Sequence, residues 1–516
     1  MSERLWRDHK SVMQKYSRSI LFLATSLAMN SSAAFAAEQP AQETIVINTD
    51  AKTKPFPHVW EHMFGSGRSI LALRDDYRAD LRKMKEVADI KYVRFHDIFH
   101  DDVGVYDEDK KGNAVYNFSY VDQIYDGLLA AGVRPFVELS FMPAKLAAKP
   151  AIIHSFWYRP NVTPPKSWQR WSALINAFTN HLIQRYGIEE VSKWYFEVWN
   201  EPDLEFWGGK PRQPTYYRLY DVTAREIKKI NPRLRVGGPA TATNDWIPSF
   251  LNHCAQNRVP LDFLSTHTYA NDDDKKPMAR SMVVANNMRR VNQMVAASRL
   301  PKVPVIWSEY NASWKNEVNV TDSEFMGPWL ANNIAVCDGL AEGMSFWTFS
   351  DVFDEDGVVK RPFYGGFGAI AIGGIPKASY NAFKLMHLTG EQRLPLQSTC
   401  ALATKRNDGS LVFAVWNYMS ATQKGSPKSV KIQLKGPLSA KHARVHLLDK
   451  DNGTALTAYK KMGSPDYPTR IQQEELRKAA ELPAPREIEL KAIDSNHAEL
   501  SLDLQPKALA VVELMD

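Results

Sequence analysis

Eight short apolar runs alternate with amphipathic helical patterns, and this alternation constrains the fold more than any other feature of the sequence. The runs span residues 59–64, 92–95, 134–139, 194–199, 234–236, 263–266, 303–308 and 343–349. Between the runs, apolar side chains recur three and four positions apart, which predicts helices over residues 76–89, 167–186, 215–230, 282–297 and 326–341. Eight such units within about 300 residues predict an α/β fold, a (β/α)8 TIM barrel.

A doubly wound open sheet would show a similar alternation. No glycine-rich phosphate loop follows the first run, which argues against a nucleotide site in such a sheet. The 516 residues exceed what one core usually holds, so a second domain is expected. We therefore predict a catalytic barrel over residues 51–385.

The pattern of apolar and polar residues changes near residue 390. Short alternating runs bounded by Gly, Pro, Asn and Asp replace the helical patterns, and they predict a C-terminal antiparallel β-sandwich over residues 390–516. Residues 43–50 alternate like an edge strand that could join this sandwich. Within it, residues 469–481 resemble a short capped helix that begins just after a proline.

The amino terminus has the pattern of a secretory signal peptide. Five basic residues precede the apolar run 19–29, and Ala34-Phe35-Ala36 forms an Ala-x-Ala cleavage site. The apolar run is too short for a comfortable membrane span, although an uncleaved anchor remains the alternative. We predict a signal peptide over residues 1–36, a periplasmic or secreted protein, and no stable membrane association.

Composition excludes some classes of partner and leaves others open. The net charge of +6 is spread along the chain without a basic block, so no nucleic-acid binding is expected. The 14 Trp and 20 Tyr residues suit sugar rings and large cores equally. Cys254, Cys337 and Cys400 are too few and too widely spaced for a disulfide framework or metal motif, and buried thiols are the simpler interpretation. The sequence carries no signal for the oligomeric state.

Two carboxylates follow the fourth and seventh apolar runs. Glu201 comes directly after Trp199-Asn200, and Glu309 lies in Trp307-Ser308-Glu309-Tyr310. In an eight-stranded barrel, strands four and seven face each other across the mouth, where barrels carry their chemistry. Two carboxylates that flank one bond are the requirement of glycoside hydrolysis, with an oligosaccharide as substrate.

These stretches also carry a family resemblance. Asn-Glu-Pro at residues 200–202 and Trp-Ser-Glu-Tyr at residues 307–310 resemble clan A retaining glycoside hydrolases. The finer match is to glycoside hydrolase family 39, the β-xylosidase and α-L-iduronidase family. Its matching stretches lie at residues 92–96, 135–139, 199–203, 265–269, 307–310, 346–351 and 363–368. The resemblance runs from about residue 43 to the end of the chain.

The resemblance implies Glu201 as general acid/base and Glu309 as nucleophile. The anion of Glu309 is expected to keep a proton on Glu201 by like-charge repulsion. Retention requires carboxyl groups about 5–5.5 Å apart, against about 6.5–9.5 Å for inversion. The expected substrate-binding residues are His96, Asn200, His267, Tyr269, Trp347, Asp354 and Glu355.

Individual roles follow from the same resemblance and from position. Asn200 is expected to donate to the sugar 2-hydroxyl, Tyr269 to hydrogen-bond Glu309, and Trp347 to form the platform beneath the sugar ring. Arg94 and Glu138 are expected to support the site. No metal ion or organic cofactor is implied, since two carboxylates suffice for the reaction.

The expected activity is exo-acting β-D-xylosidase, which releases xylose from the non-reducing ends of xylo-oligosaccharides. Four other exo-activities of the family stay open: α-L-arabinosidase, β-glucosidase, galactosidase and α-L-iduronidase. A polysaccharide endo-hydrolase would need an open cleft instead of a pocket. A non-catalytic carbohydrate-binding protein is a hypothesis of another class, which the presence of both carboxylates disfavours.

Overall fold

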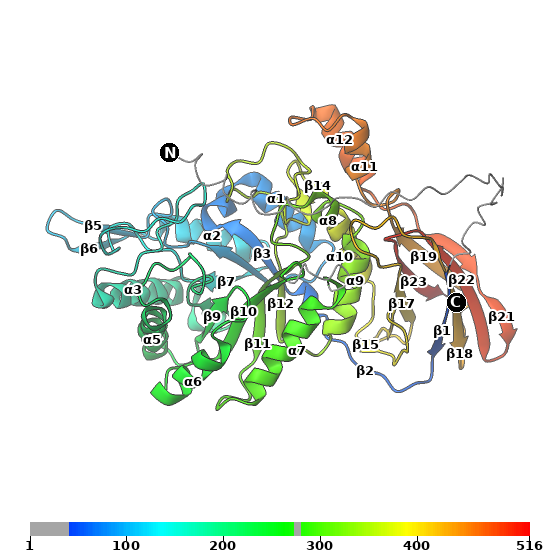
Figure 1. Cartoon of the computed structure of the whole chain (residues 1–516), viewed down its shortest axis with the longest axis horizontal. Helices are drawn as coiled ribbons and strands as arrows, with labels where there is room; N and C mark the ends of the chain where they lie inside the picture. The colour runs from blue at the N-terminus through cyan, green and yellow to red at the C-terminus, as the bar shows by residue number, and fades with distance from the viewer. Residues whose placement is uncertain (1–40, 273–279, 516) are drawn as a thin grey trace, which may run out of the picture. The chain divides into compact units, whose positions relative to one another are not determined.

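The computed structural model describes residues 41–272 and 280–515, with the side chains of residues 41 and 42 left out (Figure 1). The predicted signal peptide, residues 1–36, therefore lies outside the described residues. Within the described ranges, no helix has both the length and the apolar character that a membrane crossing requires.

Eight parallel strands close into a barrel, as the alternation of the sequence predicts. In chain order they are β3 (Met63–Arg68), β4 (Tyr92–His96), β7 (Arg134–Glu138), β8 (Tyr195–Glu197), β9 (Arg235–Thr241), β10 (Phe263–Tyr269), β11 (Val305–Asn311) and β12 (Gly343–Phe346). The barrel closes where Ser345 of β12 pairs with Met63 of β3. A layer of large side chains fills the interior near the strand starts: Met63, Phe136, Tyr195, Phe263 and Ile306. The barrel interior is thus filled near the amino-terminal ends of the strands and can be open only at their carboxyl ends.

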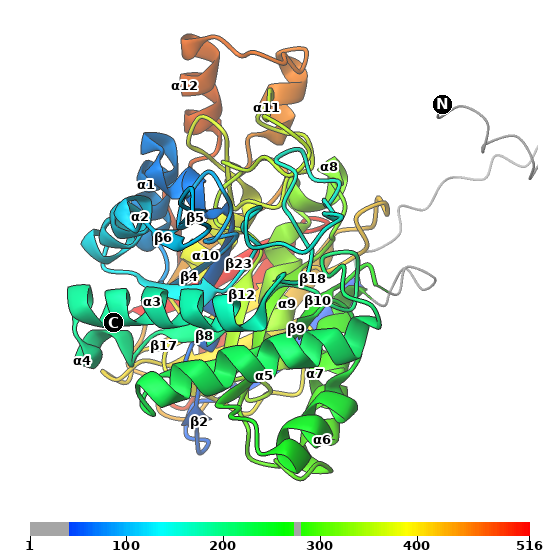
Figure 2. The ribbon, with the colours of Figure 1, turned by 90° about the vertical axis from the view of Figure 1, so that its left-hand side faces the viewer.

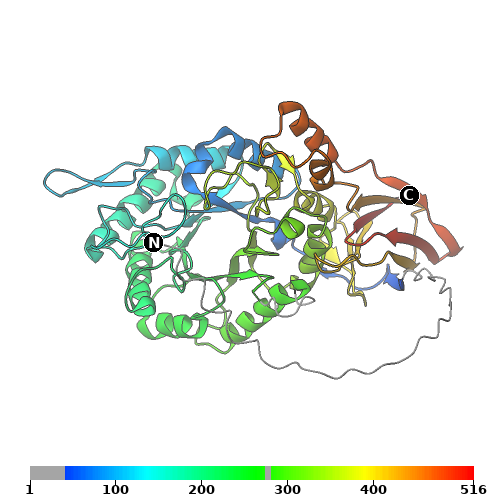
Figure 3. The ribbon, with the colours of Figure 1, turned by 45° about the horizontal axis from the view of Figure 1, so that its top comes forward.

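The helices lie outside the barrel strands (Figures 2 and 3). The larger ones are α1 (Asp75–Lys85), α2 (Ser119–Ala130), α3 (Trp168–Tyr186), α5 (Arg212–Ile230), α6 (Ile247–Asn257), α7 (Val283–Ala296), α9 (Met326–Cys337) and α10 (Ala378–Met386). Local chemistry sets their ends. The Ser167 side chain accepts from Arg170 N at the start of α3, and Gly187, with φ 78°, follows its last residue.

The sequence-based expectation was wrong for the start of the first barrel strand. Residues 59–64 were expected to be extended, whereas Val59–Glu61 form the 3₁₀ helix η1 and β3 begins at Met63. His58 adopts a left-handed backbone with φ 50°, and its carbonyl accepts from the Glu61 N–H at 3.1 Å. An apolar run alone does not reveal such a turn, because periodicity cannot separate a short helical turn from a buried strand.

Two further sheets contain the C-terminal strands together with β1 (Ala41–Asn48) and β2 (Lys54–Pro55). The first orders β1, β18 (Lys428–Lys435), β22 (His497–Leu504) and β21 (Lys491–Asp494). The second orders β2, β15 (Gln392–Arg393), β16 (Ala401–Lys405), β17 (Leu411–Trp416), β23 (Leu509–Met515), β19 (His442–Leu448) and β20 (Arg486–Glu489). The pairing is antiparallel except that β1, which contains most of the expected edge strand 43–50, runs parallel to β18.

A helical pair, α11 (Leu456–Lys461) and α12 (Arg470–Ala479), stands between β19 and β20 and projects in Figure 1. The predicted cap is present, since Thr469 Oγ1 accepts from Gln472 N and Gln472 Oε1 accepts from Thr469 N. Leu476 packs in a small apolar cluster with Phe363, which follows the last barrel strand. Cys254, Cys337 and Cys400 are free and buried.

Candidate active site

A pocket of about 580 Å³ opens at the carboxyl ends of the barrel strands. Its lining residues come from the ends of seven of the eight barrel strands or from the loops that follow them. They are His96, His154, Phe156, Asn200, Glu201, Leu204, Phe206, Ala242, Thr243, Tyr269, Asn271, Asp272, Glu309, Trp314, Trp347, Glu355 and Phe367. A volume of this size is ordinary for a small-molecule site.

Glu201 reaches the pocket through an unusual stretch of backbone. Strand β8 ends at Glu197, and the chain then passes through left-handed conformations at Trp199 (φ 75°) and Glu201 (φ 38°). The Glu201 N–H donates to Ala240 O at 2.9 Å, which anchors this turn to the end of β9. Non-glycine residues in such conformations cost about 1–3 kcal/mol each and concentrate at functional sites. The strain turns the Glu201 side chain inward over the barrel.

Glu309 lies within β11, and its carboxylate is held on both oxygens. Arg94 Nη1 donates to Oε1 at 2.6 Å, and the Tyr269 hydroxyl donates to Oε2 at 2.6 Å. All three side chains are buried. Charge-assisted bonds of this length favour the ionised carboxylate and fix its orientation. Glu309 is therefore an oriented anion in a site that excludes most water.

The two carboxylates come close to each other. One oxygen of Glu201, one oxygen of Glu309 and one ring nitrogen of His267 all lie within 4.8 Å of one another. His267 Nδ1 is 2.9 Å from Glu201 Oε1 and 3.6 Å from Glu309 Oε2. This proximity agrees with the short separation of the carboxyl groups in retaining glycosidases.

Comparison with known proteins decides the family. The model of the family described as "Glycosyl hydrolases family 39" matches residues 43–491. The chain belongs to glycosyl hydrolase family 39. It is therefore an O-glycosyl hydrolase, and the resemblance in the sequence pointed to the correct family.

Individual relatives of this chain support the same family assignment. A β-xylosidase of Geobacillus stearothermophilus is 36% identical over 82% of this chain and 86% of that protein. A β-xylosidase of Caldicellulosiruptor saccharolyticus is 34% identical over 91% of this chain and 98% of that protein. A solved family 39 β-xylosidase from Caulobacter crescentus superposes with a TM-score of 0.80 at 33% identity, covering 92% of this chain and all of that one.

Arg94 organises the floor of this family 39 site. Its guanidinium donates from Nε to Glu197 at 2.6 Å and from Nη2 to Asn200 Oδ1 at 2.9 Å, in addition to Nη1 on Glu309. Nη2 also lies 2.7 Å from Glu138. Because the Asn200 oxygen is engaged, its amide N–H groups are free to face the pocket. Asn200 is thus oriented as a donor.

Burial, more than repulsion from the neighbouring Glu309, keeps a proton on Glu201. Removal from water raises the pKa of the Glu201 carboxyl to about 7, and the like charge of Glu138 adds to this, while His96 and Arg94 oppose it. Repulsion from Glu309 was the expected cause of the retained proton, whereas desolvation is the main cause in the structure. Burial also lowers the pKa of His267 to about 4, which leaves its imidazole neutral.

His96 and Glu355 form a second polar pair at the pocket wall. His96 Nδ1 is 2.8 Å from Glu138, and Nε2 is 3.6 Å from Glu355 Oε1. Although burial opposes it, the charge of Glu138 raises the pKa of His96 to about 9. Burial raises the pKa of Glu355 to about 8. Both groups therefore carry a proton near neutral pH and can donate to sugar hydroxyls.

Trp347 lies along the pocket floor, with its ring 4.9 Å from that of His96. The indole is nearly buried and rests directly on β3. A Cβ atom at Gly65 would lie 2.1 Å from the indole Cε3, so only glycine permits this approach. Sequence analysis found Trp347 but did not identify Gly65, since an isolated glycine in a strand has many explanations.

The structure separates the two expected acidic ligands of the loop after β12. Glu355 lines the pocket, whereas Asp354 does not. Both Asp354 oxygens accept from Arg68 Nε at 3.1–3.2 Å. The expected contact between Asp354 and the sugar stays a prediction, and in this structure the carboxylate is held by Arg68. His267 likewise does not line the pocket and acts through Glu201.

An aromatic wall was missed by sequence analysis. The ring of His154 stacks on Phe206 with 4.2 Å between centroids, and Phe156 packs edge-on against Phe206 at 5.3 Å. At the rim, Trp314 is 52% exposed. These residues lie in irregular loops, where neither periodicity nor strand ends mark them. Only their aromatic character was visible, and it suits any core.

Proposed function

We propose that this family 39 enzyme is a retaining, exo-acting β-D-xylosidase that releases xylose from the non-reducing ends of xylo-oligosaccharides. The observation that carries the proposal is the pairing of an oriented anion, Glu309, with a protonated carboxyl, Glu201, across one pocket. The similarity to proteins named β-xylosidase supports the choice of sugar.

In the first step Glu309 attacks the anomeric carbon, and the bond from that carbon to the leaving oxygen breaks. Glu201 gives its proton to this oxygen, so the aglycone departs as a neutral alcohol. Arg94 and Tyr269 hold the attacking carboxylate in place. The product is a glycosyl ester on Glu309.

In the second step Glu201, now ionised, takes a proton from water as the water attacks the same carbon. The ester to Glu309 breaks and the sugar leaves with its original anomeric configuration. Once the ester has formed, Glu309 carries no negative charge that would repel the ionised form of Glu201. Asn200 donates to the 2-hydroxyl in both transition states.

The charge of the lining favours a neutral sugar over a uronate. Glu201, Glu309, Glu355 and Asp272 line the pocket, and no Lys or Arg occurs among its described lining residues. The carboxylate of an iduronide would face Glu309 and Asp272 without an arginine or lysine to clamp it, and the protonated His96 is the cation among these lining residues. A pentose brings no such charge. Arabinosidase, glucosidase and galactosidase activities stay as alternatives, since their sugars are also neutral.

A panel of aryl glycosides tests the proposal. Purified protein should release the aglycone from aryl β-D-xyloside faster than from the arabinoside, glucoside, galactoside or iduronide. Glu309→Ala should lower this rate by about 10⁴-fold or more. Release of inverted xylose would contradict the role of Glu309, and no release from any glycoside would favour a carbohydrate-binding protein.

We further propose that the two C-terminal sheets form a β-sandwich that buttresses the barrel, and that residues 1–36 direct export. Apolar side chains from both sheets, such as Ile432 and Val512, belong to one buried cluster, which supports the sandwich. Amino-terminal sequencing of protein from the periplasm or medium should begin near Ala37. An intact amino terminus would contradict cleavage.

A further inference from the structure

A second concave site lies near the amino-terminal end of β3, at the end of the barrel strands opposite to the active-site pocket. It is a surface cavity of about 700 Å³. Its charged and imidazole side chains are His58, Glu61, His62, Asp89, Lys91, His387, Glu391, Arg406 and Asp408. Neither the proposed reaction nor the family assignment uses any of them.

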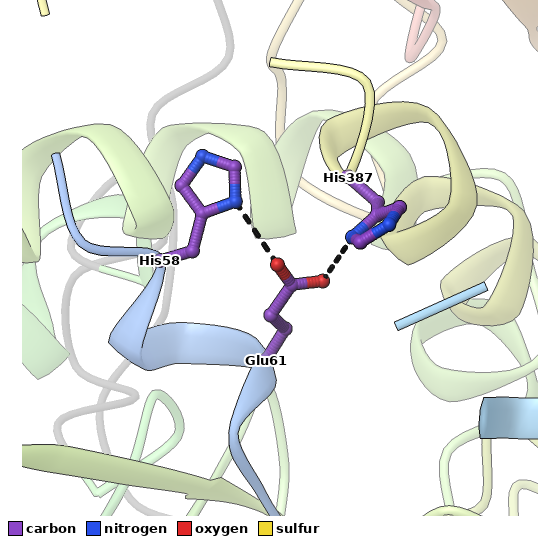
Figure 4. A group of neighbouring side chains, drawn as sticks. All are labelled: His58, Glu61 and His387. Atoms are coloured by element: carbon purple, nitrogen blue, oxygen red, sulfur yellow. Dashed lines mark hydrogen bonds and ion pairs between the residues drawn. The ribbon is translucent and has the colours of Figure 1, made fainter. Parts of the chain in front are cut away.

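Two histidines face one buried carboxylate in this cavity (Figure 4). His58 Nδ1 lies 2.9 Å from Glu61 Oε1, and His387 Nδ1 lies 2.7 Å from Glu61 Oε2. One ligand atom from each of the three residues lies within 4.8 Å of the others. The Glu61 side chain is 2% exposed, so its charge cannot rely on bulk water. Such a buried anion requires a cation or a strong donor beside it.

The surroundings of His58 determine where its ring carries hydrogen. The Thr389 hydroxyl donates to Met386 O at 2.6 Å, so its oxygen accepts from His58 Nε2, 3.2 Å away. Gly390 O, at 3.4 Å, is a second acceptor for the same nitrogen. Nε2 therefore carries a hydrogen, and in the neutral ring Nδ1 presents a lone pair toward Glu61. Either a second proton or a metal ion must lie between Nδ1 and the carboxylate.

We propose that His58, Glu61 and His387 bind one divalent transition-metal ion of the zinc class. Two imidazole nitrogens and a carboxylate are a donor set for zinc, whereas magnesium and calcium prefer oxygen ligands. A hydrogen bond from the remote ring nitrogen to a backbone carbonyl, as at Gly390, is the usual support of a histidine ligand. The Asp89 N–H supports the carboxylate in the same way, at 3.2 Å from Glu61 Oε2.

Binding of one ion requires the ligands to adjust, because the two imidazoles contact different oxygens of Glu61. Zinc bonds of about 2.0–2.2 Å place tetrahedral ligand atoms roughly 3.4 Å apart, against 2.7 and 2.9 Å here. His387 is 45% exposed at its side chain and can move outward. The open cavity supplies water for a fourth position. The acids Asp89, Glu391 and Asp408 outnumber the bases Lys91 and Arg406 around it.

A bound ion would join the first and last parts of the barrel. Glu61 belongs to η1, just before β3, and His387 follows directly after α10. Because a ligand that binds only the folded state shifts the folding equilibrium by mass action, zinc should stabilise the enzyme without entering the reaction. Its location on the side away from the pocket fits a role in stability.

Zinc titration of untagged protein tests the proposal. Glu201, His267 and Glu309 also bring ligand atoms together, so the titration is done in Glu309→Ala protein, which removes that set. One zinc per chain should bind. His387→Ala on this background should weaken binding at least about 10-fold. His62→Ala is the matched control, since His62 lines the same cavity outside the triad, and it should leave binding within about twofold.

A thermal measurement in the wild-type background adds a second readout. Zinc at about 100 times its dissociation constant should raise Tm by about 2–5 °C, and His387→Ala should remove this rise while aryl glycosidase activity shows that the variant is folded. Magnesium should have no effect, and Co²⁺ should give the visible bands of a four-coordinate ion. Absence of zinc binding in Glu309→Ala protein, equal binding in His387→Ala, or equal loss in His62→Ala would overturn the proposal.

Discussion

His267 Nδ1 lies 2.9 Å from Glu201 Oε1 and 3.6 Å from Glu309 Oε2, so one buried, neutral imidazole touches both carboxylates of the active site. It lines no part of the pocket. This geometry favours a positioning role for His267, while its expected contact with the sugar stays a prediction. This arrangement makes its removal a test of positioning.

His267→Ala should lower kcat by about 10- to 100-fold with little change in KM, because the carboxylates lose a common support while the sugar contacts stay. Steady-state kinetics on aryl β-D-xyloside would measure this. A loss of kcat/KM that came only from a higher KM, with kcat unchanged, would indicate a direct substrate contact. Asn244→Ala, which removes an amide that donates to the His267 carbonyl, is a control one contact further away.

The pH profile should have an alkaline limb set by Glu201. The pKa of its carboxyl is raised to about 7 by burial, so the protonated acid is present below pH 7 and is lost as pH rises through that value. The rate of the glycosylation step, reported by kcat/KM, should fall tenfold per pH unit above the limb. In Glu201→Ala this limb should vanish for substrates with good leaving groups, and its persistence would assign it to another residue.

Gly65→Ala should damage the sugar platform. Its Cβ would meet the Trp347 indole at 2.1 Å, so the ring must leave its place on β3. We expect kcat/KM to fall at least about 10-fold, with the protein still folded by circular dichroism. Gly67→Ala is the matched control, since its Cβ would find its nearest contacts at 3.1 Å. A Gly65→Ala enzyme with unchanged kinetics would remove Trp347 from the platform role.

Neighbouring acids should respond differently to amide substitution. Glu355→Gln removes a protonated carboxyl from the pocket wall and should raise KM several-fold. Asp354→Asn instead weakens a pair with Arg68 away from the sugar. Its effect should appear in thermal stability more than in KM. A larger rise in KM for Asp354→Asn than for Glu355→Gln would make Asp354 the sugar ligand.

Lys377→Met should destabilise the loop after β12. The Lys377 ammonium is fully buried, 2.6 Å from Asp322 and 2.5 Å from Asp351. Its loss would leave two buried carboxylates without a cation, which costs about 3–5 kcal/mol. Urea unfolding should show this loss as a lower midpoint. Lys384→Met, on helix α10, which begins one residue after Lys377, provides the control. Equal midpoints for both variants would contradict the role of Lys377 between Asp322 and Asp351.

Strand ends made the centre of the site predictable. Glu201 and Glu309 follow apolar runs four and seven, and barrel geometry alone brings those positions together. The pocket wall was not predictable in this way. His154, Phe156 and Phe206 meet through loop conformations that no period encodes. The ion pair of Asp354 was equally hidden, because its partner Arg68 lies 286 residues away.

The histidine and glutamate cluster was hidden for a similar reason. His58 and Glu61 are three residues apart and His387 is 326 residues from Glu61, so no spacing rule detects the set. A strand continued back to residue 58 would have placed the first two side chains on opposite faces. Only the turn of η1 turns both toward the same cavity.

The parallel pairing of β1 with β18 constrains the order in which the chain can fold. The two strands meet across most of the chain, as the Thr49 hydroxyl bonded to Lys435 O spans 386 residues. Synthesis produces β1 first, and its partner emerges only after the whole barrel has been made. Until then β1 is an unpaired edge strand, which is open to pairing with other chains. Any chaperone that holds the young chain must therefore shield β1 until residues 428–435 have been added.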